Sequence, residues 1–286
     1  MTEFVTVFEM GPRDGLQNEK NFVPTNDKIR LVDMLSDCGF RKIEVTSFVS
    51  PKWVPQMADA TEVMEGIYRH PSVTYAVLTP NVKGYGAAKR VSADEVAIFG
   101  SASEGFSRKN INCSIDESIE RFKPLLAKAR QDAIPVRGYV SCVVECPYDG
   151  PTPPETVARV ARTLLDLGCY EISLGDTIGA GTPETIGTML DAVLDGVPAA
   201  KLAGHYHDTK GKALDNIGVS LGKGLRTFDA AVGGLGGCPY APGAKGNVAT
   251  ESVVELLAAQ GFETGLDIDK LKSASAFARS LRTLQA

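Results

Sequence analysis

Short apolar runs rich in β-branched residues alternate with longer amphipathic stretches along most of the chain. The first run is FVTVFEM at 4–10, and a polar segment, GPRDGLQNEKNFVPTND, follows it. Next comes KIRLVDMLSDCGF, in which Leu31, Leu35 and Cys38 recur at helical spacing. Gly39 stands where such a helix would end. The pattern predicts a strand, a polar loop and an amphipathic helix.

Seven more apolar runs have the length and composition of strands, and helical patterns follow them. The expected strands lie at 41–48, 73–79, 95–101, 135–145, 169–177, 200–209 and 227–234. We read 103–113 as a loop that leads to a helix opened by Ser114, whose SIDE sequence fits a capping box. The tail, 265–286, is expected to form one more helix.

Regular alternation of strands and helices predicts a parallel sheet. Eight such units in roughly 250 residues predict a closed (β/α)8 barrel, the TIM-barrel fold of the α/β class. An open doubly wound sheet is the alternative, but it would favour GxGxxG after the first strand, where this chain has GPRDGL. Because no linker or shift in composition interrupts the pattern, we expect one catalytic domain over 1–286, with the barrel at 4–262 and a helical extension at 265–286.

Composition narrows the possible partners. The 286 residues are 43% hydrophobic and carry a net charge of -5, so the basic surface of a nucleic-acid-binding protein is missing. No apolar run approaches the roughly 18 residues of a membrane span. The chain opens directly on MTEFVTVFEM, and we therefore expect a cytoplasmic protein. Its six cysteines show no CxxC spacing, which argues against a structural zinc site and a disulfide framework.

Polar side chains follow the expected strands at their carboxyl ends, which meet at one mouth of a barrel. Those on which the site hypothesis rests are Arg13, Asp14, Glu44, Ser47, Asp176, His205, His207, Cys238 and Asn247. Barrel enzymes keep their chemistry at this mouth, so we expect these side chains to converge there.

The motif GHYHDT at 204–209 is the strongest metal signal. His205 and His207 stand two residues apart in a strand and therefore share a face. Asp14 can meet them across the mouth, and Asn247 can reach in from the last loop. Two imidazoles, a carboxylate and an amide oxygen suit a hard divalent ion such as Mg²⁺ or Mn²⁺, with zinc as an alternative. Two core histidines at a strand end are the simpler explanation of HxH alone.

Two acidic residues are expected to have different surroundings. Glu44 lies between Ile43 and Val45, which would face the helix layer if Glu44 faces the barrel interior. Asp176, in GDTIGAGTP, fits an Asx-turn or helix-start residue as well as it fits a catalytic one.

The loop GGLGGCPYAPGAKGN at 233–247 has six glycines and two prolines. It lies beyond the expected mouth and is long enough to act as a lid. Cys238 stands between Gly237 and Pro239. A free cysteine is usually a small buried apolar residue. Beside a divalent cation and Arg13, however, its thiol would have a lowered pKa and suit proton transfer.

Five segments together resemble the 3-hydroxy-3-methylglutaryl-CoA (HMG-CoA) lyases. They are GPRDGLQNEK (11–20), TSFVSPKWVPQMAD (46–59), SLGDTIGAGTP (173–183), GHYHDTKG (204–211) and GGLGGCPYAPGAKGN (233–247). The chain resembles the bacterial type of this family, which sits in a wider group of divalent-metal TIM-barrel lyases and Claisen-type synthases. The motifs are long and therefore far more specific than HxH alone.

The resemblance implies a metal-dependent retro-Claisen cleavage of HMG-CoA to acetoacetate and acetyl-CoA, as in leucine degradation or ketone body metabolism. It implies metal ligands at Asp14, His205, His207 and Asn247 for Mg²⁺ or Mn²⁺. It also implies a homodimer. Arg13 would stabilise the enolate of acetyl-CoA, and Cys238 would be the general acid. The general base is left open between Asp14, Asp176 and His205.

Supporting roles follow from the same resemblance. Glu44 would orient Arg13 or a metal-bound water. Gln17 and Ser47 would contact substrate, and Lys20 would contact a CoA phosphate. Cleavage of a related 3-hydroxy-3-alkyl acyl-CoA is the closest alternative. A Claisen-type synthase and a non-catalytic barrel are further alternatives, but neither accounts for Cys238 and its loop.

Overall fold

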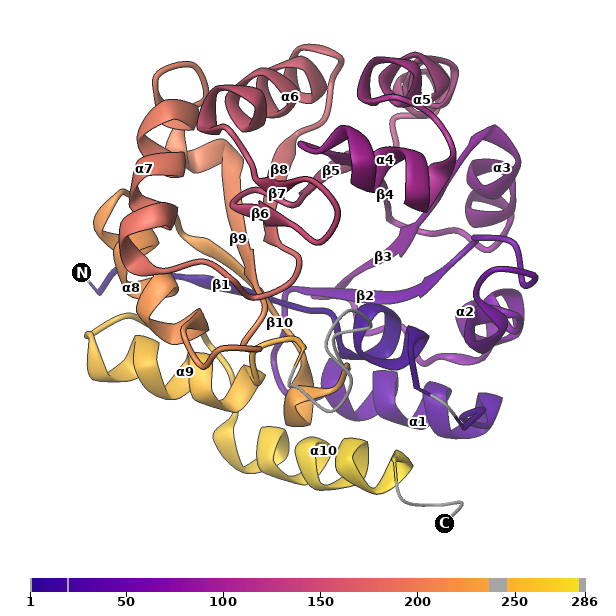
Figure 1. Ribbon diagram of the computed structural model, residues 1–286. Coiled ribbons are helices and arrows are strands. Elements are labelled where there is room, and N and C mark those ends of the chain that lie inside the picture. The colour runs from indigo at the N-terminus through magenta and orange to yellow at the C-terminus, as the bar shows by residue number, and fades with distance from the viewer. Residues whose placement is uncertain (1, 20, 237–245, 283–286) are drawn as a thin grey trace.

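Eight parallel strands close into a barrel within the residues that the computed structural model describes, which are 2–19, 21–236 and 246–282 (Figure 1). They are β1 (Thr6–Glu9), β2 (Lys42–Ser47), β3 (Thr74–Leu78), β4 (Glu95–Ser101), β5 (Val136–Ser141), β8 (Glu171–Asp176), β9 (Leu202–Tyr206) and β10 (Thr227–Ala230). Because β1 pairs in parallel with β10, the sheet has no open edge. The predicted barrel is confirmed, and the alternative of an open doubly wound sheet is wrong.

Helices surround the barrel as an outer ring (Figure 1). They are α1 (Thr25–Ser36), α2 (Ala60–Gly66), α3 (Val82–Arg90), α5 (Ile115–Gln131), α6 (Pro154–Asp166), α7 (Pro183–Leu194), α8 (Ala213–Gly222) and α9 (Thr250–Ala259). The last helix, α10 (Ile268–Leu281), contacts both α1 and α9 and so fills the ring between its first and last helices. Ser114 is the N-cap of α5 and forms the predicted capping box with Glu117.

Strand residues alternate between two separate packing environments. The outward side chains, such as Val7 and Ile43, pack in the large core between strands and helices. A smaller cluster around Phe8 and Tyr139 fills the barrel interior. Charged side chains share this interior, and they are buried because the barrel is closed. Polar interior positions occur at both ends of the barrel: Lys42 pairs with Glu95 at the amino ends of β2 and β4, and others support the candidate site at the carboxyl ends.

Two segments differ from the sequence prediction. The expected loop at 103–113 contains helix α4 (Glu104–Ile111), whose N-cap Ser103 accepts a hydrogen bond from the backbone N–H of Phe106. The expected strand at 135–145 ends at Ser141, because Cys142 has a positive φ of 59°. Beyond it a short hairpin forms from β6 (Glu145–Cys146) and β7 (Gly150–Pro151).

Short helical turns replace other expected loops and helix ends. GPRDG forms one turn of π-helix, η1 (Gly11–Gly15), in which Met10 carbonyl oxygen accepts several N–H groups. Single 3-10 turns form η2 (Pro55–Met57), η3 (Ala199–Lys201) and η4 (Val232–Gly234). Turn η1 thus presents Arg13 and Asp14 directly after β1.

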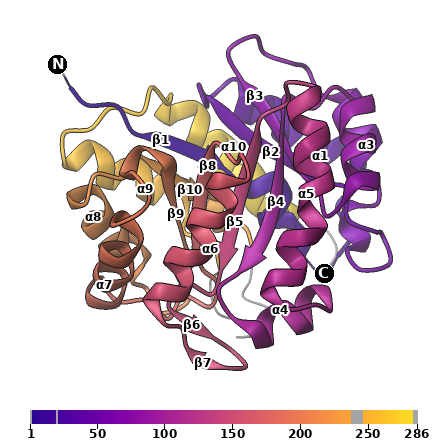
Figure 2. The same ribbon diagram turned by 90° about the horizontal axis from the view of Figure 1, so that it is seen from above.

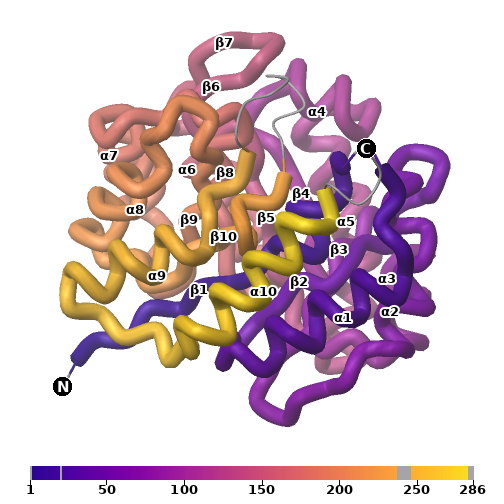
Figure 3. Tube along the Cα trace, turned by 90° about the horizontal axis from the view of Figure 1, so that it is seen from below, coloured from indigo at the N-terminus to yellow at the C-terminus, as the bar shows by residue number. Residues whose placement is uncertain are grey.

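The two ends of the barrel differ. Figures 2 and 3 show the β6–β7 hairpin and α4 at one end and the N-terminus at the other. The hairpin follows β5 directly, so its end is the one to which the strands point with their carboxyl ends. Helices in the described part of the chain are all too short or too polar to cross a membrane.

Candidate metal centre and active site

His205 and His207 converge with Asp14 at the carboxyl end of the barrel strands. The Nε2 atoms of the two imidazoles are 3.3 Å apart, and Nε2 of His205 is 3.9 Å from Oδ2 of Asp14. One nitrogen from each ring and one carboxylate oxygen all lie within 4.8 Å of one another. His205 belongs to β9, and His207 follows the strand. Asp14, which follows β1, and the two histidines at β9 are far apart in the sequence but meet in one cluster.

Asn247 completes this cluster from the last loop. Its Nδ2 donates to Oδ2 of Asp14 at 2.7 Å, and its backbone forms an isolated antiparallel bridge with His207. Gly236 lies directly against it, because a Cβ there would be 2.8 Å from Nδ2 of Asn247. Gly236 also has a φ of +98°, which favours glycine. Both features require glycine at this position.

The electrostatics differ among the three side chains of the cluster. Burial lowers the pKa of His205, but the carboxylates of Asp229 and Asp14 outweigh it and raise that pKa, whereas the pKa values of Asp14 and His207 are lowered. Burial raises the pKa of Asp14, but Arg13 and the two imidazoles outweigh it and hold that pKa at about 2. Burial and the neighbouring His205 lower the pKa of His207 to about 4. At neutral pH Asp14 is thus a carboxylate and His207 a neutral imidazole, which are the forms that bind metal ions. The donor set of nitrogen and oxygen atoms fits a divalent cation.

Arg13 joins this cluster to the barrel interior. Its NH1 lies 2.5 Å from Oδ1 of Asp14, and its Nε donates to Oε2 of Glu44. Glu44 is fully buried and faces inward, as the flanking pattern predicted, and its other oxygen accepts from the Tyr139 hydroxyl at 3.0 Å. The two carboxylates thus hold a buried guanidinium beside the candidate metal ligands.

Sequence reasoning missed the polar residues beneath the cluster. Asp229, on β10, lies 3.1 Å from Nδ1 of His205 and forms a two-pronged ion pair with Arg137. Ser173 donates to the same carboxylate at 2.7 Å. The sequence does indicate that these side chains face the barrel interior. Arg137 stands between Val136 and Gly138 in a strand, and Asp229 stands between two apolar residues in the same way as Glu44.

Asp176 has a definite structural role. Its carboxylate oxygens accept the backbone N–H groups of Ala180 at 3.0 Å and Gly181 at 2.8 Å. Of the two explanations that the sequence left open, these contacts support the turn residue. Burial nevertheless raises the pKa of Asp176 above its usual range, and the carboxylate lies at the end of β8, beside the strand that carries His205.

Of the remaining predicted site residues, the structure describes Gln17 and Ser47. Gln17 contacts the cluster, since its Nε2 donates to Oδ1 of Asp14 at 2.8 Å. Ser47 is buried at the end of β2, and its hydroxyl accepts the N–H of Val49. Lys20 and Cys238 lie outside the described residues.

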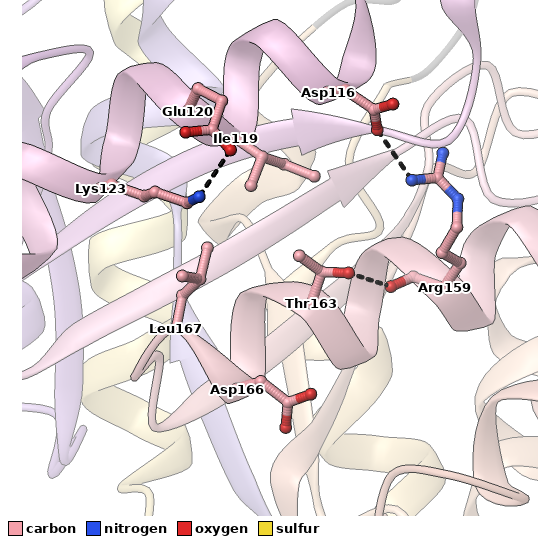
Figure 4. A pocket seen from close by; sticks show the side chains of 8 residues that line it. All are labelled: Asp116, Ile119, Glu120, Lys123, Arg159, Thr163, Asp166 and Leu167. Atoms are coloured by element: carbon pink, nitrogen blue, oxygen red, sulfur yellow. Dashed lines mark hydrogen bonds and ion pairs between the residues drawn. The ribbon is translucent and has the colours of Figure 1, made fainter.

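A surface hollow of about 460 Å³ lies elsewhere, between α5 and α6 (Figure 4). Its charged side chains are largely engaged with one another: Arg159 pairs with Asp116 at 2.9 Å, and Lys123 pairs with Glu120 at 2.5 Å. The hollow is on the outer surface of the helix ring and shares no residue with the cluster of Asp14. It is therefore separate from the candidate site.

Comparison with known proteins gives one consistent family. The model of the HMGL-like family matches residues 5–278. A Bos taurus protein named mitochondrial hydroxymethylglutaryl-CoA lyase is 59% identical over 96% of this chain and 84% of its own length. A Danio rerio relative named as the cytoplasmic HMG-CoA lyase is 57% identical over 96% of this chain and 82% of its own length. Since relatives are named for both compartments, the cytoplasmic location stays a prediction.

Solved structures agree. The HMG-CoA lyase from Brucella melitensis has 65% identity and a TM-score of 0.98, with 98% of this chain and 99% of that chain covered. An HMG-CoA lyase from Acinetobacter baumannii, solved with coenzyme A and 3-methylmalate, has 37% identity and a TM-score of 0.92 over 98% of this chain and 92% of that chain. The family match, the high identity and the shared barrel agree, and the chain belongs to the HMGL-like family, among its hydroxymethylglutaryl-CoA lyases.

Proposed function

We propose that this protein cleaves HMG-CoA to acetoacetate and acetyl-CoA with the help of Mg²⁺ or Mn²⁺. One observation carries the proposal: the guanidinium of Arg13 lies 2.5 Å from Asp14, within the same cluster as His205 and His207. A retro-Claisen cleavage has to remove a proton from the 3-hydroxyl and stabilise an enolate two bonds away. A cation site and a fixed guanidinium side by side meet both needs.

The cation would be held by Asp14, His205 and His207, with Asn247 as a further oxygen donor after rotation of its amide. A divalent cation at such a site supplies Lewis acidity, which lowers the pKa of a hydroxyl group in contact with it. The carboxylate and amide oxygens of this set favour Mg²⁺ or Mn²⁺, whereas the imidazoles also suit Zn²⁺. Gln17 donates a hydrogen bond to Asp14 and so limits the rotation of that carboxylate.

Arg13 supplies the second element. Two carboxylates, Glu44 and Asp14, fix the guanidinium before substrate arrives. Because Arg13 is only 5% exposed, little water competes with a substrate oxygen for its remaining donors. Its fixed positive charge would stabilise the thioester oxygen as the bond between C2 and C3 breaks and the electron pair moves into the enolate.

Two proton transfers complete the reaction. Asp176 would take the proton of the 3-hydroxyl, since each of its oxygens keeps acceptor capacity beyond one backbone hydrogen bond and its pKa is raised. Cys238 would deliver a proton to C2 of the enolate, an assignment that rests on the motif alone. Ser47, Gln17 and Lys20 would contact the acyl-CoA. We further propose one catalytic domain over residues 1–286 and a homodimeric assembly in the cytoplasm.

The test is acetoacetate release from HMG-CoA by metal-free protein before and after addition of Mg²⁺ or Mn²⁺. We expect release only with metal, and its loss in His207→Ala. His70→Ala is the matched control, because His70 lies before β3, at the opposite end of the barrel. Metal binding without acetoacetate release would overturn the substrate assignment. Release that needs no metal would overturn the role of the cluster.

A further inference from the structure

We propose that Asp229 is a positioning residue for the candidate metal centre, which holds the Nδ1–H of His205 and thereby directs Nε2 toward Asp14 and His207. The inference rests on the metal site in the proposed function and extends it to a residue below that site. Asp229 contacts no substrate and no cation in this scheme. It acts through His205.

Strand register brings the two residues together. Asp229 of β10 and His205 of β9 are direct partners in the parallel pairing of these strands. Both side chains point into the barrel, and Oδ2 of Asp229 lies 3.1 Å from Nδ1 of His205. The barrel backbone therefore determines this contact, and a flexible loop has no part in it.

The carboxylate itself has a fixed orientation. NH1 of Arg137 donates to Oδ2 at 3.0 Å, and NH2 donates to Oδ1 at 2.8 Å. The hydroxyl of Ser173 donates to Oδ2 at 2.7 Å. All three residues are at most 2% exposed, so water does not substitute for these bonds. A bidentate guanidinium–carboxylate pair allows little rotation of either group.

The hydrogen-bond roles then select one tautomer of His205. An ionised carboxylate can only accept, so the nitrogen that faces it has to carry the proton. In a neutral ring the proton on Nδ1 leaves the lone pair on Nε2, and Nε2 is the atom that faces Asp14 and His207. Carboxylates that support metal-binding histidines in this way contribute 10–100-fold to metal affinity.

Arg137 also connects Asp229 to the part of the site that contains Arg13. Nε of Arg137 donates to Oε2 of Glu171 at 2.7 Å, and its NH1 donates to the hydroxyl of Tyr139 at 3.2 Å. Tyr139 donates in turn to Glu44, the partner of Arg13. A continuous buried hydrogen-bonded path thus connects the metal ligand to the guanidinium above it.

Asp229→Asn separates positioning from simple packing because the shape of the side chain is kept. An amide has only one acceptor oxygen, whereas Arg137 presents a donor to each oxygen of Asp229. In either orientation the NH₂ group meets a donor of Arg137, so the two-pronged pair that fixes the side chain is lost. A neutral amide oxygen is also a weaker acceptor than a carboxylate for the Nδ1–H of His205. We expect the dissociation constant for Mn²⁺ to rise 10–100-fold in this variant.

The experiment is calorimetric titration of the metal-free protein with Mn²⁺, without substrate. Glu95→Gln is the matched control, because Glu95 is a buried carboxylate at the start of β4 whose partners are Lys42 and the hydroxyl of Tyr170, and its Mn²⁺ affinity should stay within about twofold of wild type. Equal Mn²⁺ affinity in Asp229→Asn and wild type would overturn the proposal. If wild type itself binds no Mn²⁺, the metal site of the proposed function fails as well, so the two failures are distinct.

A second measurement needs no variant at position 229 and stands even if Asp229→Asn fails to fold. The chain has three histidines, so nitrogen-15 NMR at alkaline pH can resolve their tautomers, with His70→Asn and His207→Asn used for assignment. The proposal requires the proton of His205 to be on Nδ1 in metal-free wild-type protein. A proton on Nε2 would overturn it.

Discussion

Glu9 links the turns on which the site is built, and its burial makes a specific prediction about stability. It is the last residue of β1 and is fully buried. One carboxylate oxygen accepts the N–H of Gly11 and that of Val232, both at 2.8 Å, and the other accepts the hydroxyl of Thr250 at 2.7 Å. These residues begin η1, η4 and α9 respectively, so Glu9 connects the segments on either side of Asp14 and Asn247.

Burial raises the pKa of Glu9 to about 7, from an ordinary value of 4.5, although the three donors act in the opposite direction. The folded protein therefore keeps the proton of Glu9 over a range in which the unfolded chain has lost it. The contribution of this bound proton to the free energy of unfolding is fully present below about pH 4.5 and is lost as the pH rises through about 7. At 1.36 kcal/mol for each pKa unit, the loss amounts to about 3 kcal/mol.

Glu9→Gln isolates this effect. The amide oxygen can accept both backbone N–H groups, and the amide NH₂ can donate to the Thr250 hydroxyl, so all three contacts remain possible. The variant does not titrate. We expect the free energy of unfolding of Glu9→Gln, relative to wild type, to increase by about 3 kcal/mol between pH 4.5 and pH 8.

Urea denaturation at a series of pH values measures this difference. Glu62→Gln, at an exposed position of α2, is the control, and its difference from wild type should be flat with pH. Other titrating groups are common to all three proteins and cancel. Parallel stability curves for wild type and Glu9→Gln would refute the reasoning, and acetoacetate release should be preserved in the variant.

Three further predictions follow from the structure. Arg13→Met should lower kcat for acetoacetate release by about 10²–10³, because a fixed donor to the developing oxyanion is lost. Gly236→Ala should weaken Mn²⁺ binding in calorimetry, because its Cβ would displace Asn247, whereas Gly211→Ala, with a φ of +68° and open space around it, should not. Leu125→Ala should lower the free energy of unfolding by about 2–5 kcal/mol in urea titrations, because Leu125 is fully buried.

Each of these predictions can fail separately. An unchanged kcat in Arg13→Met would remove Arg13 from the chemistry. Similar Mn²⁺ affinities in the two glycine variants would mean that backbone conformation, rather than contact with Asn247, determines the requirement at Gly236. A loss below about 1 kcal/mol for Leu125→Ala would mean that neighbouring side chains relax into the space.

The directions in which side chains point were predicted correctly where they depend on strand periodicity. His205 and His207 were expected to share a face because side chains in a strand repeat every two residues, and their Nε2 atoms are 3.3 Å apart. Glu44 was expected to face inward because apolar residues flank it, and it is fully buried. Helix α4 was missed, because its start depends on the Ser103 cap and its pattern of apolar residues is weak.

The amino-acid sequence alone was sufficient for the alternation of strands and helices, the closed barrel, the family motifs and the polar residues at the strand ends. These properties depend on residues close together in the chain or on the number of repeated units. Contacts such as His205 with Asp229, or Glu44 with Tyr139, required the structure. They arise between strands, and their partners are determined by register and barrel closure, which no local pattern encodes.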